Sequence, residues 1–423
     1  MSKLAINGGP KAVKMDPEDI FTWPIITEED EEAVLEVLRA RKMSQTDITK
    51  KFEEEFAQWH GMKYALGHNT GTASLHGALY GCGVGVGDEI ICQSMTYWAS
   101  ALPVFSLGAT VVFAEMDPDT LTLDPNDIEH RITERTKAIM VVHYCGYPTD
   151  MDPIMEIAER RGIKVIEDVS HAHGGLYKGR IVGTIGHVGA MSVMSGKSLA
   201  CGEGGILVTN DREIYEKAVA LGHYGRTGSE LTIPELKRFA GLPVGGYKYR
   251  MHQMSSAVAR VQLRHYKERM EEIQAAMNYF WDLLEDVPGV KAHRPPLGSN
   301  STMGGWYAAH GIYVPEELDG LDIGKFCAAV RAEGAGASPG ANLLLHLHPV
   351  FNEADIYGHG KPTRIAYSDR DVRQPRGSLP VTESIPARTY SIAWFKHYRP
   401  RVIEEYALAF RKVAENAEEL KDE

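Results

Sequence analysis

Apolar and polar residues alternate along the first half of the chain in a pattern typical of a sheet whose strands are joined by helices. Short apolar runs predict strands at residues 64–66, 89–92, 110–113, 138–143, 164–167, 190–194 and 206–209. The stretches between them predict helices over 72–82, 98–107, 125–132 and 153–161. Strands separated by helices of this length form β-α-β crossovers. We therefore expect an α/β protein with a mainly parallel, seven-stranded sheet.

The flanking regions predict further helices and a second domain. Thr27 followed by the acidic run 28–32 is typical of a capped helix start, and an amphipathic helix follows over 50–60. After a glycine-rich irregular stretch at 222–249, a long helix is predicted over 254–284. The last part predicts a strand at 307–314 and helices at 323–331 and 402–419. We expect an N-terminal segment (1–26), a large domain (27–286) and a smaller C-terminal α/β domain (287–423).

Composition narrows the class of protein. The 423 residues include 45 Lys and Arg against 57 Asp and Glu, a net charge of −12, and 43% are hydrophobic. This balance is that of a folded protein, and its acidic sign argues against nucleic-acid or anionic-membrane partners. The sequence shows neither a signal-like start nor an apolar run long enough to span a membrane. Five scattered cysteines without a C-x-x-C pair favour a reducing compartment, so we expect a cytoplasmic protein.

In proteins with an open parallel sheet, ligands bind beyond the carboxyl ends of the strands. The first such place is Gly67-His68-Asn69-Thr70-Gly71-Thr72-Ala73, where small residues open a helix. Backbone amides at a helix start attract anions, although a plain turn with a helix cap gives the same pattern. The glycines here and at 202–205 indicate places where the backbone comes close to a cofactor.

Two further places offer a carboxylate and an amine. Asp168 follows the strand at 164–167, so it can meet a cationic ring nitrogen or simply cap a loop. Lys197 follows Ser192 and precedes Gly202-Glu203-Gly204-Gly205; small neighbours favour a desolvated amine that forms Schiff bases. His171 and His173 form an H-x-H pair that could bind a metal, but no third ligand follows at a recognisable spacing, so we expect no metal.

Tyr97 and Trp98 follow another strand, either as core packing or as a stacking surface. Pyridoxal 5'-phosphate requires four features together: a turn that binds its phosphate, a flat aromatic surface, a carboxylate and an imine-forming lysine. The sequence therefore predicts this cofactor.

In the order and spacing of these residues, the chain resembles the DegT/DnrJ/EryC1/StrS aminotransferases, pyridoxal-phosphate enzymes that aminate keto-sugars and ketocyclitols. The similarity runs from Trp23-Pro24-Ile25-Ile26-Thr27-Glu28-Glu29-Asp30 to Tyr249-Arg250-Met251 and beyond. Its most specific signature is the serine five residues before Lys197, followed by the run G-E-G-G. The resemblance implies the fold type I architecture of pyridoxal-phosphate transferases.

The resemblance also implies roles for residues. Lys197 would form the internal aldimine and move the proton, and Asp168 would pair with the pyridine nitrogen. The phosphate would bind at the turn formed by Gly71, Thr72 and Ala73 and at the Ser192 hydroxyl. Tyr97 would stack on the ring, with Trp98 as the alternative one position later, and His171 would lie near the cofactor O3′.

One departure from the family pattern lies at Gly246-Tyr247-Lys248-Tyr249-Arg250-Met251, where the family usually has Asn in place of Lys248. That Asn reaches the phosphate of the second subunit, so the resemblance implies a homodimer with shared active sites. Lys248 either binds the phosphate as a point charge or lies in solvent.

The implied reaction moves an amino group from glutamate or glutamine to a keto-sugar or an inosose-like ketocyclitol. The alternative on the same fold is a sugar dehydratase or lyase. A non-catalytic relative and a metal-dependent hydrolase are less consistent with Lys197, Asp168 and Ser192 together. His346 and His348 resemble a segment bordering the substrate pocket, where they either bind substrate hydroxyls or have a buried, hydrogen-bonded role.

Overall fold

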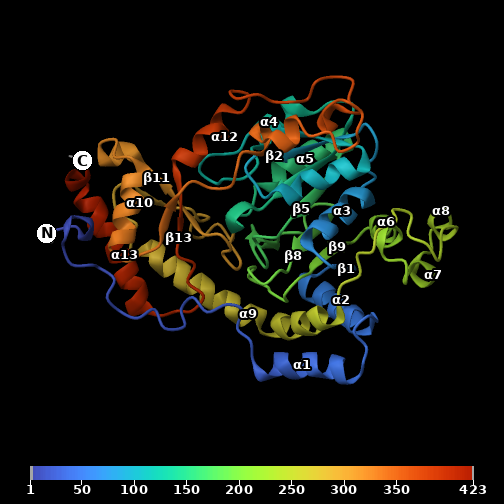
Figure 1. The fold of residues 1–423 in the computed structure, drawn as a ribbon, viewed down its shortest axis with the longest axis horizontal. Helices are drawn as coiled ribbons and strands as arrows, with labels where there is room; N and C mark the ends of the chain where they lie inside the picture. Colours follow the sequence, from blue (N-terminus) through green and yellow to red (C-terminus); the bar gives the residue numbers. More distant parts are fainter. Residues whose placement is uncertain (1–2, 422–423) are drawn as a thin grey trace.

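Seven strands form the central sheet of the large domain in the order β1-β9-β8-β5-β4-β2-β3 (Figure 1). The structure, a computed structural model, describes residues 3–421. Only β9 runs antiparallel to its neighbours, β1 and β8. The predicted mainly parallel sheet is confirmed, and the strand ends differ from the sequence patterns by no more than two residues. The strands are β1 (Tyr64–His68), β2 (Glu89–Gln93), β3 (Thr110–Ala114), β4 (Thr136–Val142), β5 (Lys164–Asp168), β8 (Val188–Ser192) and β9 (Gly205–Thr209).

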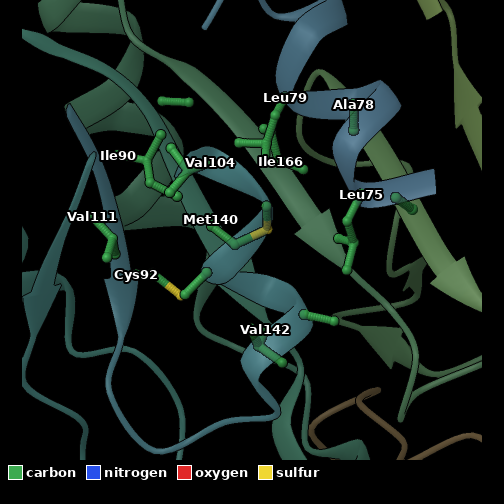
Figure 2. Packing of buried hydrophobic residues seen from close by; sticks show 14 of the residues in the cluster. Leu75, Ala78, Leu79, Ile90, Cys92, Val104, Val111, Met140, Val142 and Ile166 are labelled. Carbon is green, nitrogen blue, oxygen red and sulfur yellow. The ribbon is translucent and has the colours of Figure 1, made fainter. Parts of the chain in front are cut away.

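Both faces of this sheet are buried, which explains why its strands are apolar throughout. In β4, Met140 and Val142 face one core while Ile139 and Val141 face the other, as the alternation of a strand requires. Figure 2 shows the first core, where Leu75, Ala78 and Leu79 of α3 lie over the sheet. The second core is covered by α2, α4, α5 and the first half of α9.

Helices flank the sheet on both sides. Those of the large domain are α1 (Glu28–Arg39), α2 (Asp47–His60), α3 (Gly71–Gly81), α4 (Pro125–Arg131), α5 (Met151–Arg161), α6 (Arg212–Gly222), α7 (Thr227–Glu230), α8 (Pro234–Lys237) and the long α9 (Gln253–Asp282); a small hairpin pairs β6 (Leu176–Tyr177) with β7 (Arg180–Ile181). The capped start at Thr27 is confirmed as a capping box with Asp30.

The helix predicted over 98–107 is wrong. The chain instead forms two 3₁₀ turns, η2 (Trp98–Ser100) and η3 (Leu102–Leu107), which meet at Ala101. Pro103 has no amide hydrogen for the carbonyl of residue 99, and its ring would collide with that carbonyl in an α-helix. The break leaves the 98–100 turn free to face the ends of the strands.

A second, antiparallel sheet forms the smaller domain in the order β10-β11-β13-β12. Its elements are β10 (Val290–Ala292), β11 (His310–Tyr313), α10 (Ile323–Ala332), β12 (Ala337–Pro339), α11 (Pro349–Asn352), α12 (Pro380–Ser384), β13 (Thr389–Ile392) and α13 (Pro400–Glu415). Leu4, Ala12 and Ile20 pack into the core of this domain, so the N-terminal segment covers it (Figure 1). The first two and last two residues of the predicted segments lie outside the described residues.

The connection from β12 to β13, residues 340–388, leaves the small domain and covers the free edge of β3. The Gln374 side chain accepts from the Phe113 amide at 2.9 Å and donates to the Phe113 carbonyl at 2.7 Å. Thr382 likewise accepts from the Met116 amide. These contacts satisfy edge groups that would otherwise need another strand or water. Within residues 3–421, no helix is long and apolar enough to cross a lipid bilayer.

Candidate active site

A cavity of about 440 Å³ lies beyond the carboxyl ends of β1, β2, β4, β5 and β8. Large-domain residues line most of it, and the small domain contributes Tyr307, Ala308 and Asn342. The cavity brings together seven of the residues singled out in the sequence, which are Gly71, Thr72, Tyr97, Asp168, His171, Ser192 and Lys197. A larger pocket of about 500 Å³ beside α2 and α6 contains equal numbers of acidic and basic side chains and none of these residues.

The start of α3 lines the cavity with the residues Thr70, Gly71 and Thr72. The amides of Gly71 and Thr72 are at the first turn, where an α-helix has no acceptors of its own for them. A Cβ at Gly71 would lie 2.5 Å from the Ser192 Cβ, so only glycine lets the two segments approach. The Ser192 hydroxyl accepts from the Met194 amide, which leaves its own proton for a ligand. This donor set fits a phosphate group.

Close packing within the protein also requires glycine at two positions near the cavity. A Cβ at Gly205 would lie 2.2 Å from the Thr70 carbonyl oxygen. Gly205 is therefore needed because β9 starts against the turn before α3, and Gly71 because the turn contacts Ser192. The close approach is between backbone segments, and it fixes the turn that the cavity uses.

Asp168, at the end of β5, is buried and held by two hydrogen bonds. The Ser100 hydroxyl donates to its Oδ2 at 2.7 Å, and the Ser170 amide donates to its Oδ1 at 3.0 Å. Ser100 belongs to the 3₁₀ turn at 98–100, so the break in the predicted helix is what brings this hydroxyl to the carboxylate. A fixed carboxylate at the cavity wall can pair with a protonated ring nitrogen.

Glu167, the residue before Asp168, holds the strand end from behind the cavity. Its carboxylate accepts from the amides of Gly183, Ile185 and Gly186 and from His143 Nε2 at 2.9 Å. The His143 ring is fixed in turn, because its Nδ1 accepts from the Thr149 amide. Burial would raise the pKa of Glu167, but the hydrogen bond from His143 and the loop amides hold that pKa below its ordinary value.

Glu167→Ala is expected to destabilise the protein by about 3 kcal/mol or more, because it leaves a buried network without its acceptor. Thermal unfolding followed by circular dichroism measures the effect. Glu167→Gln is the matched control and should cost less, since its amide oxygen still accepts from the loop amides. An alanine variant that melts within about 0.5 °C of the wild type, or about 0.5 kcal/mol for a chain of this length, would contradict this role.

Lys197 lies in the cavity wall with 8% of its surface exposed. Burial lowers the pKa of its amine to about 8, while the charge of Asp168 raises it. Its ammonium lies 3.8 Å from the centroid of the Tyr307 ring. The indole nitrogen of Trp23 donates to the Lys197 carbonyl at 2.8 Å and fixes the backbone. A desolvated amine with a pKa near neutrality is suited to nucleophilic attack and to proton transfer.

His171 lines the cavity as an uncharged ring. Burial, and then the charge of Lys197, lower its pKa well below the ordinary value. Its Nδ1 accepts from the Cys145 amide at 3.2 Å, which leaves the ring proton on Nε2. Cys145 has a left-handed backbone with φ of 53°, which is uncommon for a residue other than glycine.

The structure places the remaining sequence candidates as follows. Ala73 lies one position outside the cavity lining, and its amide already donates to the Thr70 hydroxyl that caps α3. Tyr97 lines the cavity, while neighbouring Trp98 does not. His173 is turned away, with its ring bonded to the Ser192 carbonyl. Lys248 is exposed and does not reach the cavity of its own chain.

Neither His346 nor His348, for which the sequence left two roles open, lines the cavity. His346 is fully buried; its Nδ1 lies 2.6 Å from the Ser94 hydroxyl and its Nε2 lies 3.1 Å from Glu383. His348 caps α11 by accepting from the Val350 amide. Their alternative role, in hydrogen bonds that hold the chain, is the one that the structure supports.

Sequence patterns missed three residues of the site, which are Ser100, Tyr307 and Asn342. Ser100 was hidden in the predicted helix over 98–107. Tyr307 was assigned to a strand over 307–314, but β11 begins only at His310, because Trp306 and Ala308 have left-handed backbones. Asn342 comes from the distant 340–388 connection and is bonded to the Tyr144 hydroxyl. No motif in the sequence marks any of the three.

Together, the fold and this cavity define the class of pyridoxal-phosphate-dependent aminotransferases. The chain belongs to the DegT/DnrJ/EryC1/StrS aminotransferase family, whose sequence model matches residues 24–401.

Two curated relatives are similar over most of their length. The L-glutamine:2-deoxy-scyllo-inosose aminotransferase of Streptomyces kanamyceticus is 34% identical over 84% of this chain and 83% of its own. The spore coat polysaccharide biosynthesis protein SpsC of Bacillus subtilis (strain 168) is 30% identical over 84% of this chain and 91% of its own.

Solved structures agree in fold. The aminotransferase from Psychrobacter cryohalolentis superimposes with a TM-score of 0.81 at 28% identity, over 94% of this chain and 99% of that chain. S. venezuelae DesV, crystallised as a complex with a ketimine intermediate, gives a TM-score of 0.75 at 31% identity, over 92% and 94% of the two chains. The predicted fold type I architecture is confirmed.

Proposed function

We propose that this protein transfers an amino group from glutamate or glutamine to a keto-sugar or a ketocyclitol. The observation that carries the proposal is one cavity holding an anion turn, a fixed carboxylate and a desolvated lysine. When bound, pyridoxal phosphate supplies an aldehyde for the nitrogen and a protonated ring that accepts electrons. The relative named for L-glutamine and 2-deoxy-scyllo-inosose supports this donor and acceptor class.

Each side chain has a distinct task in this proposal. The amides of Gly71 and Thr72 and the Ser192 hydroxyl bind the phosphate, and Asp168 keeps the ring nitrogen protonated. Tyr97 stacks on the ring, and the Nε2 proton of His171 is directed to the ring oxygen. Lys197 binds the cofactor and, when its amine is free, takes and returns the proton at the substrate carbon.

The acceptor end of the cavity fits a neutral, hydroxylated ring. Tyr97, Tyr307 and Asn342 offer hydroxyl, amide and aromatic surfaces, which suit a polyol. Apart from Lys197, no Lys or Arg of the described chain lines the cavity. A free ketocyclitol or the sugar ring of a larger substrate is therefore preferred over a small phosphorylated ketone.

The proposal is tested by the first half-reaction. Holoprotein mixed with glutamate, and separately with glutamine, should convert to the pyridoxamine form and release the matching 2-oxo acid, which is measured by mass spectrometry. A panel of free inososes and nucleotide-linked keto-sugars then identifies the acceptor by return of the original spectrum. Loss of water from the sugar without amine transfer would instead indicate the dehydratase alternative.

We also propose that the protein works as a homodimer through an arm formed by residues 223–250. The arm, with α7 and α8, extends from the large domain (Figure 1) and exposes Phe239, Leu242 and Val244, of which Leu242 is 75% exposed. Arg226 anchors its base by a buried ion pair to Glu53 at 2.7 Å. An anchored arm with apolar side chains in solvent is typical of a surface that a second copy covers.

The five cysteines are buried and unpaired, which is compatible with work in the cytoplasm.

Lys248, on this arm, is proposed to reach the phosphate site of a second copy. Lys248→Ala should then weaken pyridoxal phosphate binding about tenfold, because one charge-assisted contact is lost. Fluorescence titration of the apoprotein measures the affinity, and sedimentation velocity measures the oligomeric state. Lys237→Ala on the same arm is the control and should bind normally. Unchanged affinity in the Lys248 variant would place this lysine in solvent.

A further inference from the structure

Tyr307 belongs to a constrained segment, residues 304–308, that runs from the small domain into the cavity. Gly304, Trp306 and Ala308 all have left-handed backbones, with φ of 60°, 56° and 57°. Residues other than glycine adopt this conformation only where their surroundings enforce it, and such residues cluster at functional sites. Trp306 and Ala308 flank Tyr307, whose ring contacts Lys197.

The segment is pressed against Ser198, the residue after Lys197, and against the backbone at His173. A Cβ at Gly305 would lie 2.1 Å from the Ser198 Cβ, and a Cβ at Gly304 would lie 2.3 Å from the His173 carbonyl oxygen. Trp306 is buried and belongs to the core of the small domain. The position of Tyr307 is therefore set by contacts on both sides of the cavity.

The Tyr307 ring is oriented by two aromatic neighbours. Its centroid lies 4.7 Å from the His171 ring and 5.8 Å from the Trp394 ring, which stands almost perpendicular to it at 87°. Held in this way, the ring presents its face to Lys197 Nζ at 3.8 Å. This distance is well inside the range of a cation–π interaction.

The charged and titratable groups around Lys197 do not provide another partner. Within the described chain, none of the ion pairs joins a carboxylate to the Lys197 ammonium, and Asp168 raises the pKa of the amine through its charge. Cys145 also raises the pKa of the amine, while Lys197 lowers the pKa values of His171 and His173. A buried ammonium without an acidic partner gains most from a desolvated ring face.

We propose that Tyr307 is a positioning residue whose ring face holds the free Lys197 amine inside the cavity during the part of each cycle in which the cofactor carries the nitrogen. This inference rests on the proposed role of Lys197 and adds a partner for the amine in its unbonded state. A held amine stays beside the reacting carbon and away from water. The proton that it carries is therefore available at the place where it is needed.

Trace labelling with acetic anhydride tests this directly on the full chain freed of cofactor. The acetylation rate of Lys197 is followed against pH by peptide mass spectrometry, with Lys267, whose side chain is 78% exposed, as the internal reference. The proteins compared are the wild type, Tyr307→Phe, Tyr307→Leu and, as a matched control, Tyr398→Leu at a partly exposed tyrosine outside the cavity. Circular dichroism and gel filtration check folding, and Tyr307→Met replaces the leucine variant if that variant does not fold.

The proposal predicts how the pH midpoint of Lys197 acetylation changes from variant to variant. Tyr307→Phe keeps the ring face, so the Lys197 midpoint should stay within about 0.3 pH unit of the wild type. Tyr307→Leu removes the ring but keeps the site apolar, so the midpoint should fall by about 0.5 to 1 pH unit, a three- to tenfold change in the protonation equilibrium.

Two results would overturn the proposal. If a folded Tyr307→Leu variant leaves the Lys197 midpoint unchanged, the ring only packs. If Tyr307→Phe lowers the midpoint as much as leucine does, the hydroxyl and not the ring is responsible. Because the labelling needs neither cofactor nor substrate, its outcome is independent of whether the proposed amine transfer is found.

Discussion

Replacing Lys197 by alanine is expected to remove the visible absorption of bound cofactor and to lower the rate of amine transfer by about 10⁴-fold or more. The reason is that, in the proposed mechanism, one buried amine both binds the cofactor and moves the proton. With 8% of its surface exposed and a pKa lowered to about 8 by burial, it is suited to both tasks. Absorption spectra and a single-turnover assay with glutamate measure the two effects separately.

The control is Lys197→Arg, which keeps the positive charge and the length but cannot release a proton near neutral pH. It should be as inactive as the alanine variant while retaining the fold. Lys396→Ala is a second control, because burial also lowers the pKa of that amine to about 8, yet it lies outside the cavity. Amine transfer that survives in Lys197→Ala would refute the proposed mechanism.

Asp168→Ala is expected to lower the rate of the same half-reaction by about 10²- to 10³-fold, since a fixed charge is removed from the place where we propose that the ring nitrogen binds. The carboxylate is held at 2.7 Å by Ser100 and at 3.0 Å by the Ser170 amide, so little reorganisation is needed when the ring charge develops. Stopped-flow absorbance with saturating glutamate measures the rate.

Ser100→Ala supplies a graded comparison for this prediction. It leaves Asp168 in place but removes one of its two orienting hydrogen bonds, so a loss of about tenfold is expected. Ser100→Thr should restore most of the rate because it returns a hydroxyl. Should Asp168→Ala keep more than a tenth of the wild-type rate, the carboxylate would not be the partner of the ring nitrogen.

The strands of the large sheet were predictable because each is buried on both faces. An apolar run such as residues 138–143 has no polar position before its last residue, His143, and its length excludes most helices. The helix over 98–107 failed for a local reason, since an apolar pattern does not register the missing amide of Pro103. The strand over 307–314 began too early because left-handed backbones at Trp306 and Ala308 are not encoded in hydrophobicity.

For the site, the sequence identified the residues that directly follow strands. Asp168, Ser192 and Lys197 could be placed because the carboxyl ends of neighbouring parallel strands meet at one edge. For His346 and His348 the sequence left two roles open, since a motif cannot tell whether a ring faces a cavity or, like His346, a half-buried Glu383. Residue type identifies the chemistry that a side chain can perform, whereas its hydrogen-bond partners determine whether it is free to perform it.

The sequence by itself determined the family, the cofactor class and the strands after which the reactive side chains stand, because these depend on local pattern and spacing. Only the tertiary structure decided how the groups are held. Ser100 contacts Asp168 across 68 residues of the chain, and Tyr307 contacts Lys197 across 110 residues. Asn342 reaches the cavity from the connection between β12 and β13. Such contacts arise from the packing of two domains and a long connection, and no local pattern in the sequence encodes them.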